Sequence, residues 1–121
     1  MLPDLIKQYA RFISSWQVYE YDKDGPNLRL KSKIVFVDKN EFHIRQVIIC
    51  NKFFKYAYHL QTEHGELVSR WDNANHWPEI KTHPHHKHVQ TKKGEDVQES
   101  FHGGDLKKIF HEITQKMDKL I

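Results

Sequence analysis

The stretch RWDNANHWPEIKTHPHHKH, residues 70–88, contains the side chains of this sequence that are best suited to chemistry. It combines an arginine and a carboxylate, Arg70 and Asp72, with an unusual density of imidazoles. Imidazole changes charge at about pH 6.5, so two histidines beside one phosphodiester can act as base and acid. Imidazole is also a common metal ligand. The histidines of the stretch are His76, His83, His85, His86 and His88.

Metal binding is the first interpretation of this run. Histidines two residues apart on a strand point to the same side, so they can share one ion. The run contains two such pairs, but the chain has a single cysteine and no HExxH pattern. The spacing therefore matches no common structural zinc motif, and a solvated histidine-rich loop remains an alternative. For a divalent metal, the candidate ligands are His76, His85, His88 and Asp72.

A second group combines this stretch with FKYAYHLQ, residues 54–61. If His59 lies beside Arg70 and Asp72, the three side chains can serve one phosphate. The imidazole would move a proton, the guanidinium would stabilise negative charge, and the carboxylate would orient one of them. The alternative is a surface ion pair between Arg70 and Asp72, with no role for His59.

Alternating apolar residues predict an antiparallel β-meander that would position both groups. The segments 28–37, 41–49, 53–61 and 66–73 alternate between short turns, and WQVYEY (16–21) indicates a fifth strand. Helical spacing predicts amphipathic helices over 2–13 and 105–121. The second has Asp105 as its N-cap and an apolar stripe that reaches Leu120. We therefore expect an α+β fold of about five strands, with both helices packed on the aromatic face of the sheet.

The predicted register determines which side chains share a face. A four-residue loop at 62–65 places Tyr58 opposite Ser69, and His59 then lies diagonal to Arg70, within reach of a long side chain. The face away from the helices is strongly basic, which favours contact with nucleic-acid phosphates. A polar outer face is also ordinary for a one-sided antiparallel sheet. The basic side chains of this face are Arg29, Lys31, Lys33, Arg45, Lys55 and Arg70, with His43 and His59.

Composition and charge narrow the class of protein. The chain of 121 residues is 38% apolar, which predicts one globular domain over residues 1–121. No apolar run approaches the roughly 18 residues that a membrane-spanning helix needs, and MLPDLIKQYARF has no signal-peptide core. A single cysteine excludes a disulfide framework within one chain. These features favour a cytoplasmic protein with no membrane contact. The net charge of +3 is compatible with a nucleic-acid partner.

The motifs KYAYHLQ, ELVSRWDNANHWPEI and THPHHKHV resemble those of the TumE family, the toxin halves of prokaryotic type II toxin–antitoxin pairs. The shared pattern is Tyr-x-Tyr-His on one strand, Arg-aromatic-Asp-Asn on the next, a histidine, and then Pro-His-His-Lys-His-Val. The resemblance covers residues 15–120, and its specific part is 55–89. Two positions depart from the pattern: His83 stands where an apolar residue is expected, and Trp77 stands where another histidine is expected.

The resemblance implies an RNA-cleaving toxin, encoded beside an antitoxin with a DNA-binding segment, and a homodimer is a further option. In this hypothesis, His59 or a histidine of 85–88 deprotonates a ribose 2′-OH, and another histidine protonates the leaving 5′-oxygen. Arg70 stabilises the charge that develops on the phosphate. The catalytic candidates are His59, Arg70, Asp72, His76, His85, His86 and His88. The RNA-binding candidates are Lys31, Lys33, Arg45, Lys55, Tyr58, Asn73 and Lys87.

Two other functions remain open from the sequence. A metal-dependent nuclease or hydrolase would use a divalent metal held by the ligands named above, whereas the leading hypothesis needs no cofactor. A non-catalytic RNA-binding module would depend on the charges of Lys31 and Arg45, and it would not depend on His59.

Overall fold

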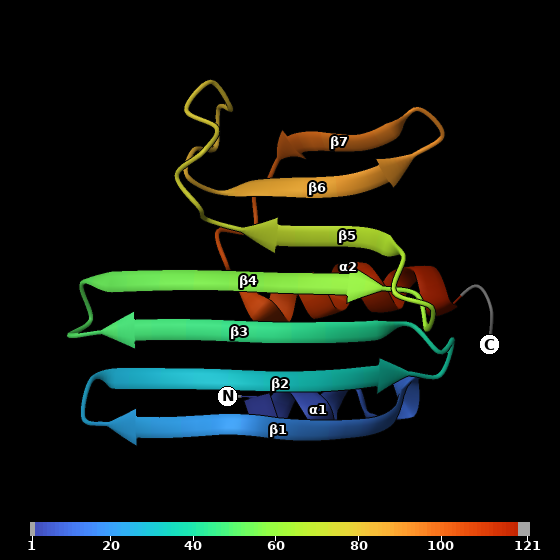
Figure 1. The fold of residues 1–121 in the computed structure, drawn as a ribbon. Helices are drawn as coiled ribbons and strands as arrows, with labels where there is room; N and C mark the ends of the chain where they lie inside the picture. Colours follow the sequence, from blue (N-terminus) through green and yellow to red (C-terminus); the bar gives the residue numbers. More distant parts are fainter. Residues whose placement is uncertain (1, 119–121) are drawn as a thin grey trace.

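The chain folds into an antiparallel sheet whose neighbouring strands follow the order of the sequence (Figure 1). The computed structural model describes residues 2–118. Helix α1 (Leu2–Gln8) precedes the sheet, a 3-10 turn covers Ala10–Phe12, and helix α2 (Leu106–Asp118) follows the sheet. The strands are β1 (Ile13–Asp24), β2 (Asn27–Phe36), β3 (Glu41–Ile49), β4 (Phe53–Gln61), β5 (Leu67–Asp72), β6 (His86–Thr91) and β7 (Gly94–Glu99).

The predicted α+β meander with a helix at each end is confirmed, but the described part of the chain contains seven strands rather than about five. The unpredicted strands are β6 and β7. HKHVQT and GEDVQE carry one aliphatic residue each, so they lack the apolar alternation that marks a half-buried strand. Backbone pairing with the edge of β5 makes β6 a strand, and β7 then closes a hairpin with β6.

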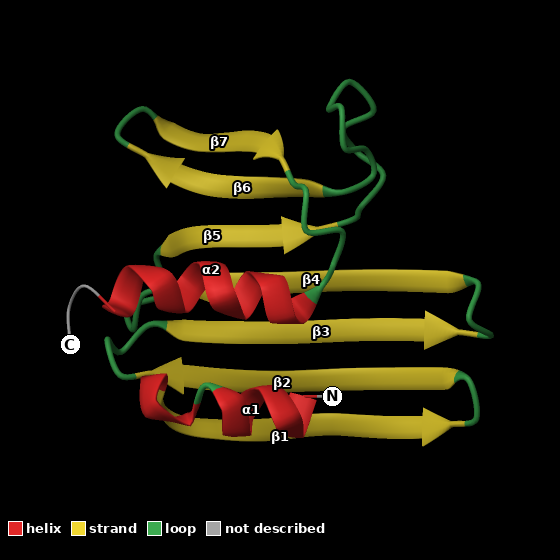
Figure 2. Cartoon of the chain, turned by 180° about the vertical axis from the view of Figure 1, so that it is seen from behind, coloured by secondary structure: helices red, strands yellow, loops and turns green. Residues whose placement is uncertain are grey.

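Both helices pack on the same face of the sheet, as predicted: α1 lies over β1 and β2, and α2 lies over β3 and β4 (Figure 2). Phe42 is fully buried at the centre of this layer. Its ring centroid is 5.6 Å from that of Phe110 on α2 and 6.2 Å from that of Trp71 on β5. The predicted apolar stripe of α2 is buried as far as Met117, and Leu120 lies outside the described residues.

Helix α2 is also tied to the sheet through the carboxylate of Glu112. Lys87 Nζ on β6 donates to Glu112 Oε2 at 2.8 Å, and His102 Nε2 lies 2.9 Å from Oε1. Burial raises the pKa of Glu112, but the hydrogen bonds from Lys87 and His102 outweigh burial and leave this pKa below its usual range. Lys87 therefore belongs to the helix-covered face of the sheet.

The register of β4 and β5 differs from the predicted one. The turn between these strands, closed by a hydrogen bond from Thr62 N to Glu66 O at 2.8 Å, is one residue longer than expected. A β-bulge near Val68 adds a second residue. His59 consequently lies directly opposite Arg70, and the predicted diagonal placement is wrong. Because the two shifts sum to two residues, the side chains of residues 69–72 keep their predicted faces.

Gly104, just before α2, is a position where backbone and packing both require glycine. Its φ is +79°, and a Cβ built there would lie 2.6 Å from Tyr56 Cε1 and 2.9 Å from Phe54 Cε2. We expect Gly104→Ala to lower the free energy of unfolding by about 2–4 kcal/mol, because left-handed strain adds to overpacking. Urea unfolding measures this loss.

Gly103→Ala is the matched control for this prediction. Its φ is +58°, yet an added Cβ would meet nothing within 4 Å. The expected loss is therefore the backbone strain alone, about 1–2 kcal/mol. Equal losses for the two variants would show that the close approach of the tyrosine ring to Gly104 is not a constraint on the fold.

Candidate functional site

The face of the sheet opposite the helices carries a row of polar side chains that crosses four strands. Each member is the direct cross-strand partner of the next, and directly opposed side chains have Cβ atoms about 4.5–5.5 Å apart. We call this set the His/Arg row: His43 on β3, His59 on β4, Arg70 on β5 and His88 on β6. The neighbouring row contains Arg45, Ala57, Asp72 and His86 in the same strand order.

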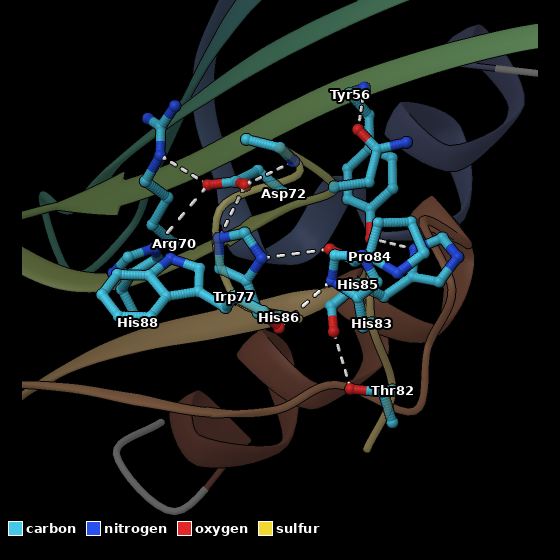
Figure 3. Close-up of polar contacts among 12 residues, drawn as sticks. Tyr56, Arg70, Asp72, Trp77, Thr82, His83, Pro84, His85, His86 and His88 are labelled. Atoms are coloured by element: carbon cyan, nitrogen blue, oxygen red, sulfur yellow. Dashed lines mark hydrogen bonds and ion pairs between the residues drawn. The ribbon is translucent and has the colours of Figure 1, made fainter. Parts of the chain in front are cut away.

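Asp72 is the buried centre of the site, with 7% of its side chain exposed. Its Oδ1 accepts a hydrogen bond from Ala74 N at 3.0 Å, and its Oδ2 accepts one from Arg70 Nε at 3.1 Å. His86 Nε2 lies 2.8 Å from Oδ1, and His88 Nε2 lies 3.8 Å from Oδ2 (Figure 3). A carboxylate this deeply buried needs cationic or N–H neighbours, and these four groups surround it.

The two histidines of β6 turn the same edge of their rings toward Asp72. His86 Nδ1 lies 3.1 Å from the carbonyl oxygen of Pro84, to which only a protonated ring nitrogen can donate. His88 Nδ1 lies 2.6 Å from Glu95 Oε1, at ion-pair distance but without hydrogen-bond geometry. Both Nε2 atoms then face the carboxylate. Two imidazole nitrogens and one carboxylate oxygen lie within 4.8 Å of one another, which is a donor set suited to a transition metal.

The Arg70 guanidinium links this buried carboxylate to His59, and 39% of the Arg70 side chain is exposed. Its Nη1 lies 3.5 Å from His59 Nδ1, the outer limit of a hydrogen bond. Burial lowers the pKa of His59 below its ordinary value of 6.5, and positive charge on Arg70, His43 and His88 lowers it further, against the opposing effect of Glu95. His59 is therefore mostly neutral at pH 7, beside an exposed cation.

Not all the predicted catalytic histidines come together. His86 and His88 reach the open face, but His85 Nδ1 lies 2.8 Å from the Tyr56 hydroxyl, and these two rings stack 5.7 Å apart. His76 lies exposed in the loop after β5. The reason is that β6 begins at His86, so strand alternation directs residues 86 and 88 to the open face and Lys87 to the other.

The predicted set of metal ligands is consequently wrong in composition. Among the described residues, the group that could hold a metal contains Asp72 and His88 together with His86. His76 and His85 are not part of it. The two-residue spacing did predict a shared direction for ligands. This holds for His86 and His88, which lie on β6, and not for His83 and His85, which lie in the loop before it.

Three of the RNA-binding candidates are buried or make contacts within the protein. Tyr58 is fully buried on the helix-covered face, and Lys87 points to that same face, where it binds Glu112. Asn73 hydrogen-bonds the backbone of β4 through Oδ1 and Nδ2, at 3.0 Å and 2.7 Å. The prediction that Tyr58, Asn73 and Lys87 are available to RNA is therefore wrong in this structure.

The other RNA-binding candidates lie on the open face, but the charge of that face is not uniform. Directly paired residues point to the same side of a sheet. The register therefore brings acidic side chains of the edge strands to this face, opposite basic ones in several cases. The basic side chains at its centre include Lys31, Lys33, Arg45 and Lys55, and the acidic side chains at its edges are Glu20, Asp22, Glu95 and Glu99.

Three residues that complete the site were not among the predicted catalytic, RNA-binding or metal-binding residues. His43 had been placed on the basic face, and the register now makes it the direct partner of His59. Glu95 reaches His88 from β7, a strand that the apolar pattern did not reveal. The Trp77 indole lies edge-on to the rings of His86 and His88, at centroid distances of 6.4 Å and 6.3 Å.

Fold and site together define a class of protein: a small α+β protein whose open sheet face holds several imidazoles beside an exposed guanidinium. The family model for the toxin TumE matches residues 3–117. Because this is nearly the whole chain, the chain belongs to the TumE toxin family, and the predicted resemblance is confirmed. Neither the search of curated proteins nor that of solved structures found a match.

Membership of a toxin family implies an antitoxin partner in general. Within residues 2–118, neither helix combines the length and the apolar run required to cross a membrane.

The electrostatics of His59 can be measured by an NMR titration of its imidazole. We expect a pKa below 6.5, because burial and the charge of Arg70 both disfavour protonation. Arg70→Gln should raise the pKa toward 6.5 without reaching it, since burial is the larger cause and remains. Lys55→Gln removes a positive charge from the same strand and should leave the pKa unchanged. A His59 pKa at or above 6.5 in the unaltered chain would contradict this account.

Proposed function

We propose that this TumE-family toxin cleaves RNA at the His/Arg row, by attack of a ribose 2′-OH on the adjacent phosphodiester. The observation that supports this proposal is the placement of His59, whose pKa is lowered, between a second imidazole, His43, and the guanidinium of Arg70. His43 and Arg70 are substantially exposed, with 41% and 39% of their side chains accessible, so a phosphate can approach both.

In the proposed reaction, neutral His59 takes the proton of the 2′-OH as the new bond from O2′ to phosphorus forms. Arg70 donates hydrogen bonds to the non-bridging oxygens, where negative charge accumulates, and Asp72 holds the guanidinium through Nε. Protonated His43 gives its proton to O5′ as the bond from phosphorus to O5′ breaks. Electrons and protons balance, and the products are a 2′,3′-cyclic phosphate and a 5′-hydroxyl.

Substrate binding is assigned to the basic centre of the open face. Lys31, Arg45 and Lys55 are exposed there, and Lys33 lies closer to the His/Arg row. Their charges would neutralise backbone phosphates, while the acidic edges would confine the strand to the middle of the sheet. Because the nucleophile is the 2′-OH, DNA of the same sequence would bind and remain intact.

Type II pairing is the corresponding proposal for regulation. It requires a protein antitoxin, and we propose that this antitoxin carries a DNA-binding segment. The cytoplasmic location and the homodimer remain predictions.

The experiment is end-group analysis of RNA after incubation with the purified chain. We expect 2′,3′-cyclic phosphate and 5′-hydroxyl ends, and no cleavage of a substrate with 2′-deoxyribose at the cleaved position. A 3′-hydroxyl product would contradict the proposal, because it requires an activated water or another external nucleophile, as in a metal-dependent nuclease.

Variants test the assigned roles. His59→Asn and His43→Asn should each lower the cleavage rate by about 10²–10⁴-fold, the usual contribution of a positioned acid or base. His64→Asn is the matched control, since this histidine lies in the exposed turn between β4 and β5. Circular dichroism checks that the variants fold. Toxicity that survives His59→Asn but is lost in Arg45→Glu would indicate a non-catalytic RNA binder.

A further inference from the structure

The buried cluster behind Arg70 has an arrangement that RNA cleavage at the His/Arg row does not explain. Asp72, His86 and His88 come from two adjacent strands, and His86 is the direct cross-strand partner of Asp72. Their side chains are 7%, 2% and 15% exposed. Side chains this inaccessible have little direct access to a large substrate, so their convergence needs another physical reason.

The contacts of the two ring nitrogens of His86 bear on what lies between its ring and the Asp72 carboxylate. Its Nδ1 faces the Pro84 carbonyl oxygen at 3.1 Å and must carry a proton to bond it. In a neutral ring the lone pair of Nε2 then faces a carboxylate oxygen 2.8 Å away, which is repulsive. A proton on Nε2 or a metal ion between the two atoms would make this contact favourable.

His88 repeats the same arrangement. Glu95 Oε1 lies 2.6 Å from its Nδ1, at ion-pair distance, and its Nε2 faces the Asp72 carboxylate at 3.8 Å. If both rings carried a second proton, they would place two like charges at a centroid separation of 4.9 Å in a buried pocket. One divalent ion would replace both protons with the same total charge.

The surroundings match those of bound metals. Metal-ligating histidines usually donate their other ring N–H to a backbone carbonyl or a carboxylate. Here the Pro84 carbonyl faces His86 Nδ1 at hydrogen-bond distance, and the Glu95 carboxylate lies at ion-pair distance from His88 Nδ1. The Trp77 indole lies edge-on beside both rings, which are 2% and 15% exposed, so water has limited access to them. Asp72 is held by the Ala74 amide, so its position does not depend on the ion.

We propose that Asp72, His86 and His88 bind one divalent transition-metal ion through a carboxylate oxygen and two Nε2 atoms. Zn²⁺ fits best, since it takes nitrogen and oxygen ligands without a preferred d-electron geometry. The ion would cross-link β5 to β6 at the carboxylate that orients Arg70. This site is separate from the proposed base and acid, His59 and His43, and the proposal does not rest on RNA cleavage.

The test is a titration of metal-free protein with Co²⁺ and then Zn²⁺, without RNA. The protein must be purified without a tag or metal resin, because a histidine-rich chain binds such resins. We expect one equivalent of Co²⁺, visible absorption bands of a low-coordinate nitrogen and oxygen site, displacement by Zn²⁺, and a higher unfolding temperature with either ion.

Variants separate this site from adventitious binding by the histidine run. His86→Gln, His88→Gln and Asp72→Asn should each abolish the stoichiometric bands, and Glu95→Gln should weaken binding by about 10–100-fold.

His76→Gln and His85→Gln remove histidines of the same run and should bind as the parent does. Near-ultraviolet circular dichroism checks that each variant folds. If His86→Gln does not fold, His88→Gln tests the proposal instead, because His88 is the least buried of the three ligands. The proposal would be overturned if the parent chain bound no saturable equivalent of Co²⁺. Loss of binding in His76→Gln or His85→Gln, or parent-like binding in folded His88→Gln, would also overturn it.

Discussion

The carboxylate of Asp72 is the group on which the polar half of this protein depends. It ends β5 in a buried position, where an unpaired negative charge would be very unfavourable. Its neighbours satisfy it from several directions: the Ala74 amide, the Arg70 guanidinium and the imidazoles of His86 and His88. Because each neighbour must reach the same two oxygens, the loop after β5, the start of β6 and the conformation of Arg70 are constrained together.

Strand alternation explains how the chain separates this polar cluster from the core within a few residues. Arg70 and Asp72 face the open side, while Trp71 between them packs against Phe42 with its ring centroid 6.2 Å away. On β6, His86 and His88 face the open side, and Lys87 between them binds α2. In the Arg-aromatic-Asp and His-Lys-His patterns, the outer two residues therefore point to the open face and the middle residue points to the helix-covered face.

Alternation was also what made much of the fold predictable. The segments with clear apolar alternation, β2 to β5, and helix α2 were expected at nearly their observed positions, whereas the helix predicted over 2–13 ends at Gln8. β6 and β7 were not, because their partners are polar side chains and backbone groups, which leave no apolar period. The open-face positions of His59, Arg70 and Asp72 followed from the period alone. Their actual pairing depended on the turn length and on the bulge near Val68, which local sequence does not specify.

Arg70 connects the buried cluster to the exposed row and so couples the two halves of the site. Nε binds Asp72 at 3.1 Å, which leaves Nη1 directed toward His59 at 3.5 Å. The pKa of His59 thus responds to the group that Asp72 holds in place, and not only to its own burial. Any change in charge at Asp72, by a proton or by an ion, would alter how firmly the guanidinium is held. The electrostatics of the open face therefore depend on buried side chains that lie beneath it.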